Sequence, residues 1–151
     1  AIPLGARITG SDWREGGLTP DDAVAIARAL KGEGVDFVCI SSGGVAADIR
    51  NPTEPGYNVS IAARVKKEAG IPTRTVGLIV KADHAEDIVA KGQADLVSMA
   101  RCFLDDPHWG WHAAKALGAD VVRPPQYQRA GPKLWAPAAS TASTASAAAK
   151  A

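Results

Sequence analysis

The residues that point most directly to chemistry are Leu96-Val97-Ser98-Met99-Ala100-Arg101, an apolar run that ends in a small residue and a cation. We expect a helix to begin soon afterwards, near Pro107. In a β/α protein this pattern places a cation and free backbone N–H groups at the carboxyl end of a strand, where ligand phosphates bind. Arg101 is therefore the predicted anchor of a phosphate site. The alternative is a surface arginine at the start of a helix.

The first helix that must support such a site has a clear start signal. Thr19 is a predicted N-cap, Pro20 occupies the first helical position, and acidic residues fill the first turn. Apolar residues then recur at helical spacing, and Gly32 and Gly34 end the helix. A short strand, residues 4–10, precedes it and contains Arg7.

The same alternation continues along the chain. Residues 35–40 form a nearly continuous apolar run, which is typical of a strand buried on both faces. Further strands are expected at 71–80 and 94–100, and further helices at 59–69, 82–91 and 107–117. Residues 45–58 form a long loop, and loops of this length are often functional. The predicted order is β-α-β-α-β-α-β-α.

Parallel strands joined by helices form either a (β/α)8 barrel or a doubly wound open sheet. A whole barrel needs about 250 residues, so four units correspond to half of one. Half a barrel leaves two open strand edges and an uncovered inner face, and it should not be stable as a monomer. From the pattern alone, an open α/β sheet fits the length of 151 residues equally well.

Composition narrows the function classes. A net charge of +1 argues against nucleic-acid binding, and the absence of a long apolar run argues against a membrane span. No signal-peptide pattern is present, and Cys39 and Cys102 are expected to be reduced core thiols of a cytoplasmic protein. Residues 131–151 are a low-complexity tail rich in Ala, Ser and Thr, which we expect to be disordered.

Several motifs, in order over residues 4–130, resemble the Old Yellow Enzyme family of flavin-dependent ene-reductases. The likeness is to the bacterial subclass of xenobiotic reductases and NADPH dehydrogenases. The motifs are Ala6-Arg7-Ile8-Thr9, Ser11-Asp12-Trp13, Ser41-Ser42-Gly43-Gly44, Pro55-Gly56-Tyr57-Asn58-Val59, Val76-Gly77-Leu78-Ile79, Ala94 to Arg101, Asp106-Pro107 and Pro125-Gln126-Tyr127-Gln128-Arg129. Individually each is weak, and together they are specific.

The resemblance implies a (β/α)8 TIM barrel that holds FMN at the carboxyl ends of its strands. It places residues 1–130 as the C-terminal half of that barrel, strands five to eight. It also implies a partner, the missing N-terminal half of the barrel.

The resemblance also implies the cofactor-binding residues. Arg7 would reach the flavin ring near N1 and O2; the alternative is a salt bridge with an acid such as Asp12. Gly77 would bring a backbone N–H to the phosphate, and Arg101 would bind that phosphate through its guanidinium. The family usually has glycine just before this arginine, whereas this chain has Ala100. Ser42 and Gly43 would line the ribityl or phosphate side, although a plain turn explains them almost as well.

Arg129, in the segment that contains Tyr127, matches an arginine finger that crosses a dimer interface and helps to form the neighbouring subunit's substrate site. The resemblance therefore implies a homodimer or homotetramer.

The implied activity is FMN-dependent reduction of activated C=C bonds of enones, with NADPH or NADH as the reductant. The family's substrate-binding His/His or His/Asn pair, its proton-donating tyrosine and its flavin-tuning cysteine fall in the missing half. We therefore expect no catalytic residue in this chain. One alternative is an inactive split, proteolysed or engineered half-barrel that acts only as a scaffold. A more distant one is a different phosphate-binding α/β protein.

His108 and His112 are four residues apart on a predicted helix, a spacing that can bind a metal. No third ligand accompanies them or His84, so we expect no metal site. Trp109 and Trp111 are expected to cover the barrel or an interface.

Overall fold

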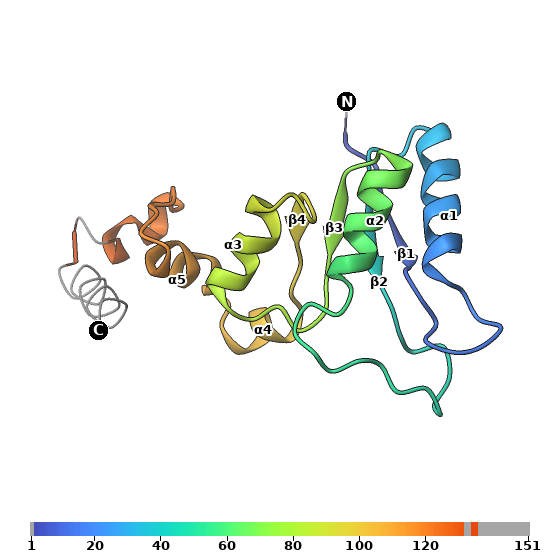
Figure 1. Ribbon diagram of the computed structural model, residues 1–151. Coiled ribbons are helices and arrows are strands. Elements are labelled where there is room, and N and C mark those ends of the chain that lie inside the picture. Colours follow the sequence, from blue (N-terminus) through green and yellow to red (C-terminus); the bar gives the residue numbers. More distant parts are fainter. Residues whose placement is uncertain (1, 132–133, 136–151) are drawn as a thin grey trace. The chain divides into compact units, whose positions relative to one another are not determined.

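A computed structural model describes residues 2–131, 134 and 135 (Figure 1). The chain divides into two compact units, residues 1–101 and residues 102–151. The predicted tail at 131–151 lies almost entirely outside the described residues. None of the described helices has the length and apolar run needed to span a bilayer.

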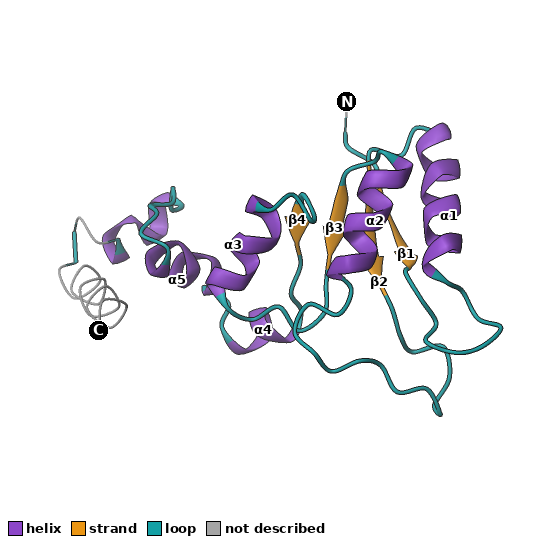
Figure 2. Cartoon of the chain, in the orientation of Figure 1, coloured by secondary structure: helices purple, strands orange, loops and turns teal. Residues whose placement is uncertain are grey.

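The first unit is a four-stranded parallel sheet with helices between its strands (Figure 2). The strands are β1 (Gly5–Thr9), β2 (Phe37–Ser41), β3 (Thr73–Thr75) and β4 (Leu96–Val97). The helices that connect them are α1 (Pro20–Gly32), α2 (Val59–Ala69) and α3 (Ala82–Ala90). The predicted alternation of strands and helices in this unit is confirmed.

The strand order β1-β2-β3-β4 favours one of the two folds that the pattern left open. In a doubly wound sheet the order reverses at a switch point, which puts helices on both faces. Here every strand pairs with its successor, and right-handed crossovers then put all the helices on one face. Figure 1 shows α1, α2 and α3 on the same side of the sheet. This sequential, one-sided arrangement is the one found in a (β/α)8 barrel.

The core lies between the sheet and these helices. Val38 and Ile40 of β2, and Thr73 and Thr75 of β3, are fully buried on the helix side. Because side chains alternate across a strand, the intervening residues lie on the opposite face. We call this the helix-free face; its members are Gly5, Arg7, Thr9, Phe37, Cys39, Ser41, Arg74 and Leu96.

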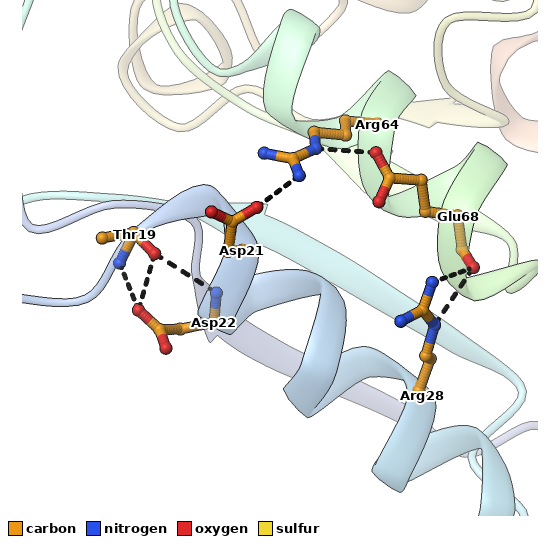
Figure 3. A network of polar contacts seen from close by, with 6 residues as sticks. All are labelled: Thr19, Asp21, Asp22, Arg28, Arg64 and Glu68. Carbon is orange, nitrogen blue, oxygen red and sulfur yellow. Dashed lines mark hydrogen bonds and ion pairs between the residues drawn. The ribbon is translucent and has the colours of Figure 1, made fainter.

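Polar contacts fix α1 and α2 to each other (Figure 3). Thr19 and Asp22 form the predicted capping box at the start of α1. The guanidinium of Arg64 on α2 pairs with both Asp21 and Glu68, and Arg28 donates to the backbone carbonyl of Glu68 at 3.0 and 3.2 Å. These contacts hold the two helices side by side over the sheet.

Two predicted strands are shorter than expected. The predicted strand at 71–80 ends at Thr75, because Gly77 has φ 125° and Leu78 has φ 53°, conformations that no strand accommodates. The predicted strand at 94–100 is only Leu96–Val97. The residues left over form loops at the carboxyl edge of the sheet, so more of the chain is available there for binding than the apolar pattern indicated.

The second unit differs from the single predicted helix at 107–117. It contains most of α4 (Arg101–Asp105), α5 (Trp109–Ala116) and a 3-10 helix, η1 (Pro125–Ala130). The first of these helices starts at Arg101 itself, before Pro107. Aromatic rings pack the unit: Trp111 lies 5.1 Å from Tyr127 and 4.5 Å from His108, and Phe103 lies 5.9 Å from Trp109, between ring centroids.

Candidate functional site

The predicted cofactor residues of the first unit all lie at or near one edge of the sheet. Ser42 and Gly43 directly follow β2, Gly77 follows β3 by two residues, and Ala100 and Arg101 follow β4 by three and four. Because the strands are parallel, their carboxyl ends meet at this edge. The structure thus brings together residues that are up to 94 positions apart in the sequence, from Arg7 to Arg101.

Arg7 lies in the middle of β1 on the helix-free face. Its Nη2 atom donates a hydrogen bond of 2.8 Å to the hydroxyl of Ser41, the last residue of β2. The guanidinium is therefore directed along the sheet toward the carboxyl edge. No ion pair joins it to an acid among the described residues, so the alternative of a salt bridge with Asp12 is wrong. The carboxylate of Asp12 instead accepts from the backbone N–H of Leu18 at 2.7 Å.

A turn from the long loop closes over the ends of β2 and β3. The Gly56 N–H donates to the Gly77 carbonyl at 2.7 Å, and the hydroxyl of Ser42 donates to Oδ1 of Asn58 at 2.8 Å. Asn58 is fully buried, and its Nδ2 has no hydrogen-bond partner. The sequence reasoning gave Asn58 no separate role, and its place in the Pro55-to-Val59 motif is the one signal that could have drawn attention to it.

Both predicted site glycines have a local structural reason. A Cβ on Gly77 would lie 2.9–3.2 Å from the ring of Tyr57, and a Cβ on Gly43 would lie 2.1 Å from the amide of Asn51. Both residues also have positive φ, 125° and 94°. Glycine is therefore required at these positions whether or not a ligand approaches them.

A cavity of about 550 Å³ lies between the loops that follow β1 and β2. Trp13, Arg14, Asp48 and Arg50 are among the residues that line it. Trp13 is held in a left-handed conformation with φ 55°, and its ring meets that of Tyr57 edge-on at 6.4 Å. A left-handed backbone is unusual for so large a side chain, and such outliers gather at binding sites.

Arg101 is an exposed side chain at the first position of α4, a helix of only five residues. Because so short a helix adds little to anion binding, any contribution of this segment to binding an anion would come from the guanidinium of Arg101 itself. Ala100, just before it, is also exposed.

Tyr127 and Arg129 lie in η1 of the second unit, and both side chains are exposed. Tyr127 packs edge-on against Trp111, which also carries the guanidinium of Arg123 at 5.4 Å from its ring centroid. Arg129 is therefore presented from a short helix that aromatic packing holds in place.

The cysteines and histidines show no reactive arrangement. Both cysteines are free; Cys39 is buried, but Cys102 is only half-buried in α4, so its prediction as a core residue is wrong. Partial burial and the nearby Asp106 and Asp105 raise the pKa of the Cys102 thiol. His112 pairs with Asp106 at 2.6 Å, and no set of three metal-binding side chains occurs in the described part of the chain.

The residues at this edge fit FMN by charge. Two cations, Arg7 and Arg101, come from β1 and from the segment after β4, and FMN carries a phosphate and a ring that accepts negative charge on reduction. An exposed guanidinium without an acidic partner favours an anion.

These observations define the class, an α/β protein with a parallel sheet and a cationic site at the carboxyl edge of its strands. Residues 2–120 match the NADH:flavin oxidoreductase / NADH oxidase family, and the chain belongs to that family. This confirms the resemblance to the Old Yellow Enzyme family drawn from the motifs.

Curated relatives named NADPH dehydrogenase are similar to most of this chain. The chain is 44% identical over 127 residues to the protein of Geobacillus thermodenitrificans. This match covers 84% of this chain and 37% of that protein. It is 43% identical over 131 residues to the protein of Bacillus licheniformis, and 36% identical over 128 residues to that of Listeria monocytogenes. Each match covers 85% or 86% of this chain and 38% of the relative. The chain therefore spans less than two fifths of the length of these relatives.

Proposed function

We propose that this chain supplies the C-terminal half of the (β/α)8 barrel of an FMN-dependent ene-reductase. The observation that carries the proposal is the sequential parallel sheet with helices on one face and the cations Arg7 and Arg101 at its carboxyl edge. The family match and the relatives named NADPH dehydrogenase support the flavin and the nicotinamide reductant.

Each residue has a specific role in this proposal. Arg101 binds the phosphate of FMN, with Gly77, Ser42 and Gly43 beside it. Arg7 stabilises negative charge on the pyrimidine side of the flavin ring, and its bond to Ser41 holds it there. FMN, when bound, carries hydride from NADPH or NADH to the β-carbon of an enone. The residues that bind the enone and donate the proton belong to the rest of the barrel, and Arg129 reaches a neighbouring subunit of a homodimer or homotetramer.

The test needs a complete barrel. We define the chimaera as the Geobacillus thermodenitrificans relative in which this chain replaces the matching 127 residues. We expect the chimaera to purify with FMN and to oxidise NADPH in the presence of a simple cyclic enone. Arg101→Ala should weaken FMN binding about 100-fold, and Arg101→Lys less, because a lysine keeps the charge but not the paired hydrogen bonds.

A colourless chimaera that folds would contradict the proposal, as would FMN binding that Arg101→Ala leaves unchanged. The helix-free face and the two edge strands, β1 and β4, favour a second candidate function for the isolated chain, that of an inactive scaffold. FMN binding and NADPH oxidation by the isolated chain would contradict this second candidate.

A further inference from the structure

Arg74 is the second cation on the helix-free face, and the proposed FMN site does not use it. It lies in the middle of β3, in register with Cys39 of β2 and Leu96 of β4. Its neighbours in sequence, Thr73 and Thr75, are fully buried on the helix side. Strand alternation therefore directs Arg74 away from the helices.

The guanidinium of Arg74 lies over the ring of Phe37, with Cζ 5.6 Å from the ring centroid. The ring can occupy this place because residue 5 is glycine: a Cβ there would lie 2.2–2.6 Å from the ring atoms. Gly5, Phe37 and Arg74 thus pack as a unit across three strands. The position of the guanidinium is set by this packing.

The guanidinium of Arg74 forms no ion pair with a described residue. Its Nε is buried and has no hydrogen-bond partner. A buried donor left without an acceptor is destabilising, and contact with an aromatic ring offsets only part of that cost.

The side chains of the two arginines on this face extend toward opposite ends of the sheet. Arg7 reaches Ser41, the last residue of β2, whereas Arg74 lies over Phe37, the first residue of β2. A ligand bound at the carboxyl edge satisfies Arg7 but lies at the far end of the strand from Arg74. The anion for Arg74 must therefore come from elsewhere.

The charge of the helix-free face also indicates which kind of polypeptide can cover it. The face carries two arginines and no acidic residue. A second copy of this chain seated on it would enclose four arginines, and like charges in a low-dielectric interior repel strongly. A polypeptide that carries an inward-facing carboxylate would instead form an ion pair with Arg74.

We propose that the helix-free face is a docking surface for an acidic complement, in which an aspartate or glutamate of the segment that closes the barrel pairs with Arg74. This inference rests on the proposed half-barrel function and adds the chemistry of the contact. Arg74 acts here as a docking residue at the end of the sheet opposite the cofactor.

The test compares one substitution in two contexts. In the isolated chain, Arg74→Met should leave urea unfolding unchanged or move its midpoint upward, because it removes an unpaired buried donor. In the chimaera, the same change should raise the unfolding equilibrium constant on the order of 100-fold, because it leaves a buried carboxylate without a partner. Arg64→Met is the matched control: its partners Asp21 and Glu68 lie within this chain, so its effect should be similar in both contexts.

A pH series separates an ion pair from simple packing. In the chimaera, the loss caused by Arg74→Met should shrink as the pH falls toward the pKa of the partner carboxylate, whereas a packing defect would persist. Arg74→Lys should recover part of the loss at pH 7.

Equal stability of the Arg74→Met and unsubstituted chimaeras, with FMN still bound, would overturn this inference while leaving the proposed function standing. A chimaera that fails to fold would contradict both. Sedimentation of the isolated chain tests whether a second copy of the chain covers the helix-free face instead. A dimer that Leu96→Glu dissociates would overturn the inference, whereas a monomer, or an oligomer that Leu96→Glu leaves intact, supports it.

Discussion

Arg7 and Ser41 are 34 residues apart in the sequence, yet the Arg7 guanidinium donates a 2.8 Å hydrogen bond to the Ser41 hydroxyl across two paired strands. The strand pairing sets this contact, since Arg7 and Ser41 lie on the same face two residues apart in register. The bond restricts a long, flexible side chain to one direction, toward the carboxyl edge. Preorganisation of this kind reduces the entropy lost when a ligand binds.

Ser41→Ala should therefore weaken FMN binding by the chimaera without abolishing it. Loss of one hydrogen bond corresponds to about 1 kcal/mol, or roughly 3- to 10-fold in the FMN dissociation constant. Quenching of FMN fluorescence on titration measures the constant. Ser60→Ala is the matched control, because Ser60 is exposed on α2. An unchanged constant for Ser41→Ala would show that Arg7 needs no support from Ser41.

Thr75→Val should stabilise the protein. Thr75 is fully buried on the helix side of β3, and its hydroxyl has no hydrogen-bond partner in this structure. Valine has a similar shape without the unpaired polar group, so we expect a gain of about 1 kcal/mol in the free energy of unfolding. Urea denaturation measures it. Thr75→Ser, which keeps the hydroxyl and loses the methyl group, should lower the same free energy, and a loss with valine would show that the hydroxyl is satisfied in solution.

Thr19→Ala should cost about 1 kcal/mol in the free energy of unfolding. The Thr19 hydroxyl accepts from the Asp22 N–H at 3.3 Å, and the Asp22 carboxylate accepts from the Thr19 N–H at 2.8 Å (Figure 3). The substitution removes half of this capping box and frays the first turn of α1. Circular dichroism during urea unfolding reports the loss. Thr53→Ala, in an exposed loop, should have no measurable effect.

The carboxylate of Asp95 should make stability depend on pH. Partial burial opposes its ionisation, but the hydrogen bond from the Thr73 N–H at 2.9 Å and the charge of Lys66 at 2.9 Å outweigh burial and lower the pKa of Asp95 below 3.8. A lowered folded-state pKa means that the ionised form is favoured in the folded state. The stabilisation is fully present above the unfolded-state pKa and is lost as the pH falls through the folded-state value.

Asp95→Asn should therefore reduce the loss of stability on acidification below about pH 4. Urea midpoints measured between pH 6 and pH 3 test this expectation. Glu86→Gln, on the exposed surface of α3, is the control. Parallel pH profiles for the Asp95→Asn and unsubstituted proteins would contradict the assignment.

Local signals in the sequence were sufficient to predict most elements of the first unit. Two examples are the Thr19-Pro20-Asp21-Asp22 start of α1 and Gly70, which ends α2. Each signal acts within one helical turn, so it can be recognised without tertiary information. The motifs that identify the family are also properties of the sequence, and the family match confirms them.

The same local reasoning misjudged the length of β3. Val76 to Val80 is as apolar as a buried strand, but Gly77 has φ 125°, and its carbonyl accepts a 2.7 Å hydrogen bond from the N–H of Gly56, about 20 residues earlier in the chain. No pattern within residues 71–80 contains that information. The second unit was likewise predicted as one helix, whereas α4 starts at Arg101 and α5 at Trp109.

The sequence by itself therefore determined the family, the alternation of strands and helices, and the residue types of the candidate FMN site. Only the tertiary structure decided the strand order, which distinguishes a sheet covered on one face from a doubly wound sheet. The local apolar pattern does not show which strands pair with one another. The tertiary structure also decided that Arg7 is directed at the carboxyl edge of the sheet and that Arg74, at a similar position in another strand, is directed at the other end. Both directions come from contacts across strands, with Ser41 and with Phe37, and not from the residues beside each arginine in the chain.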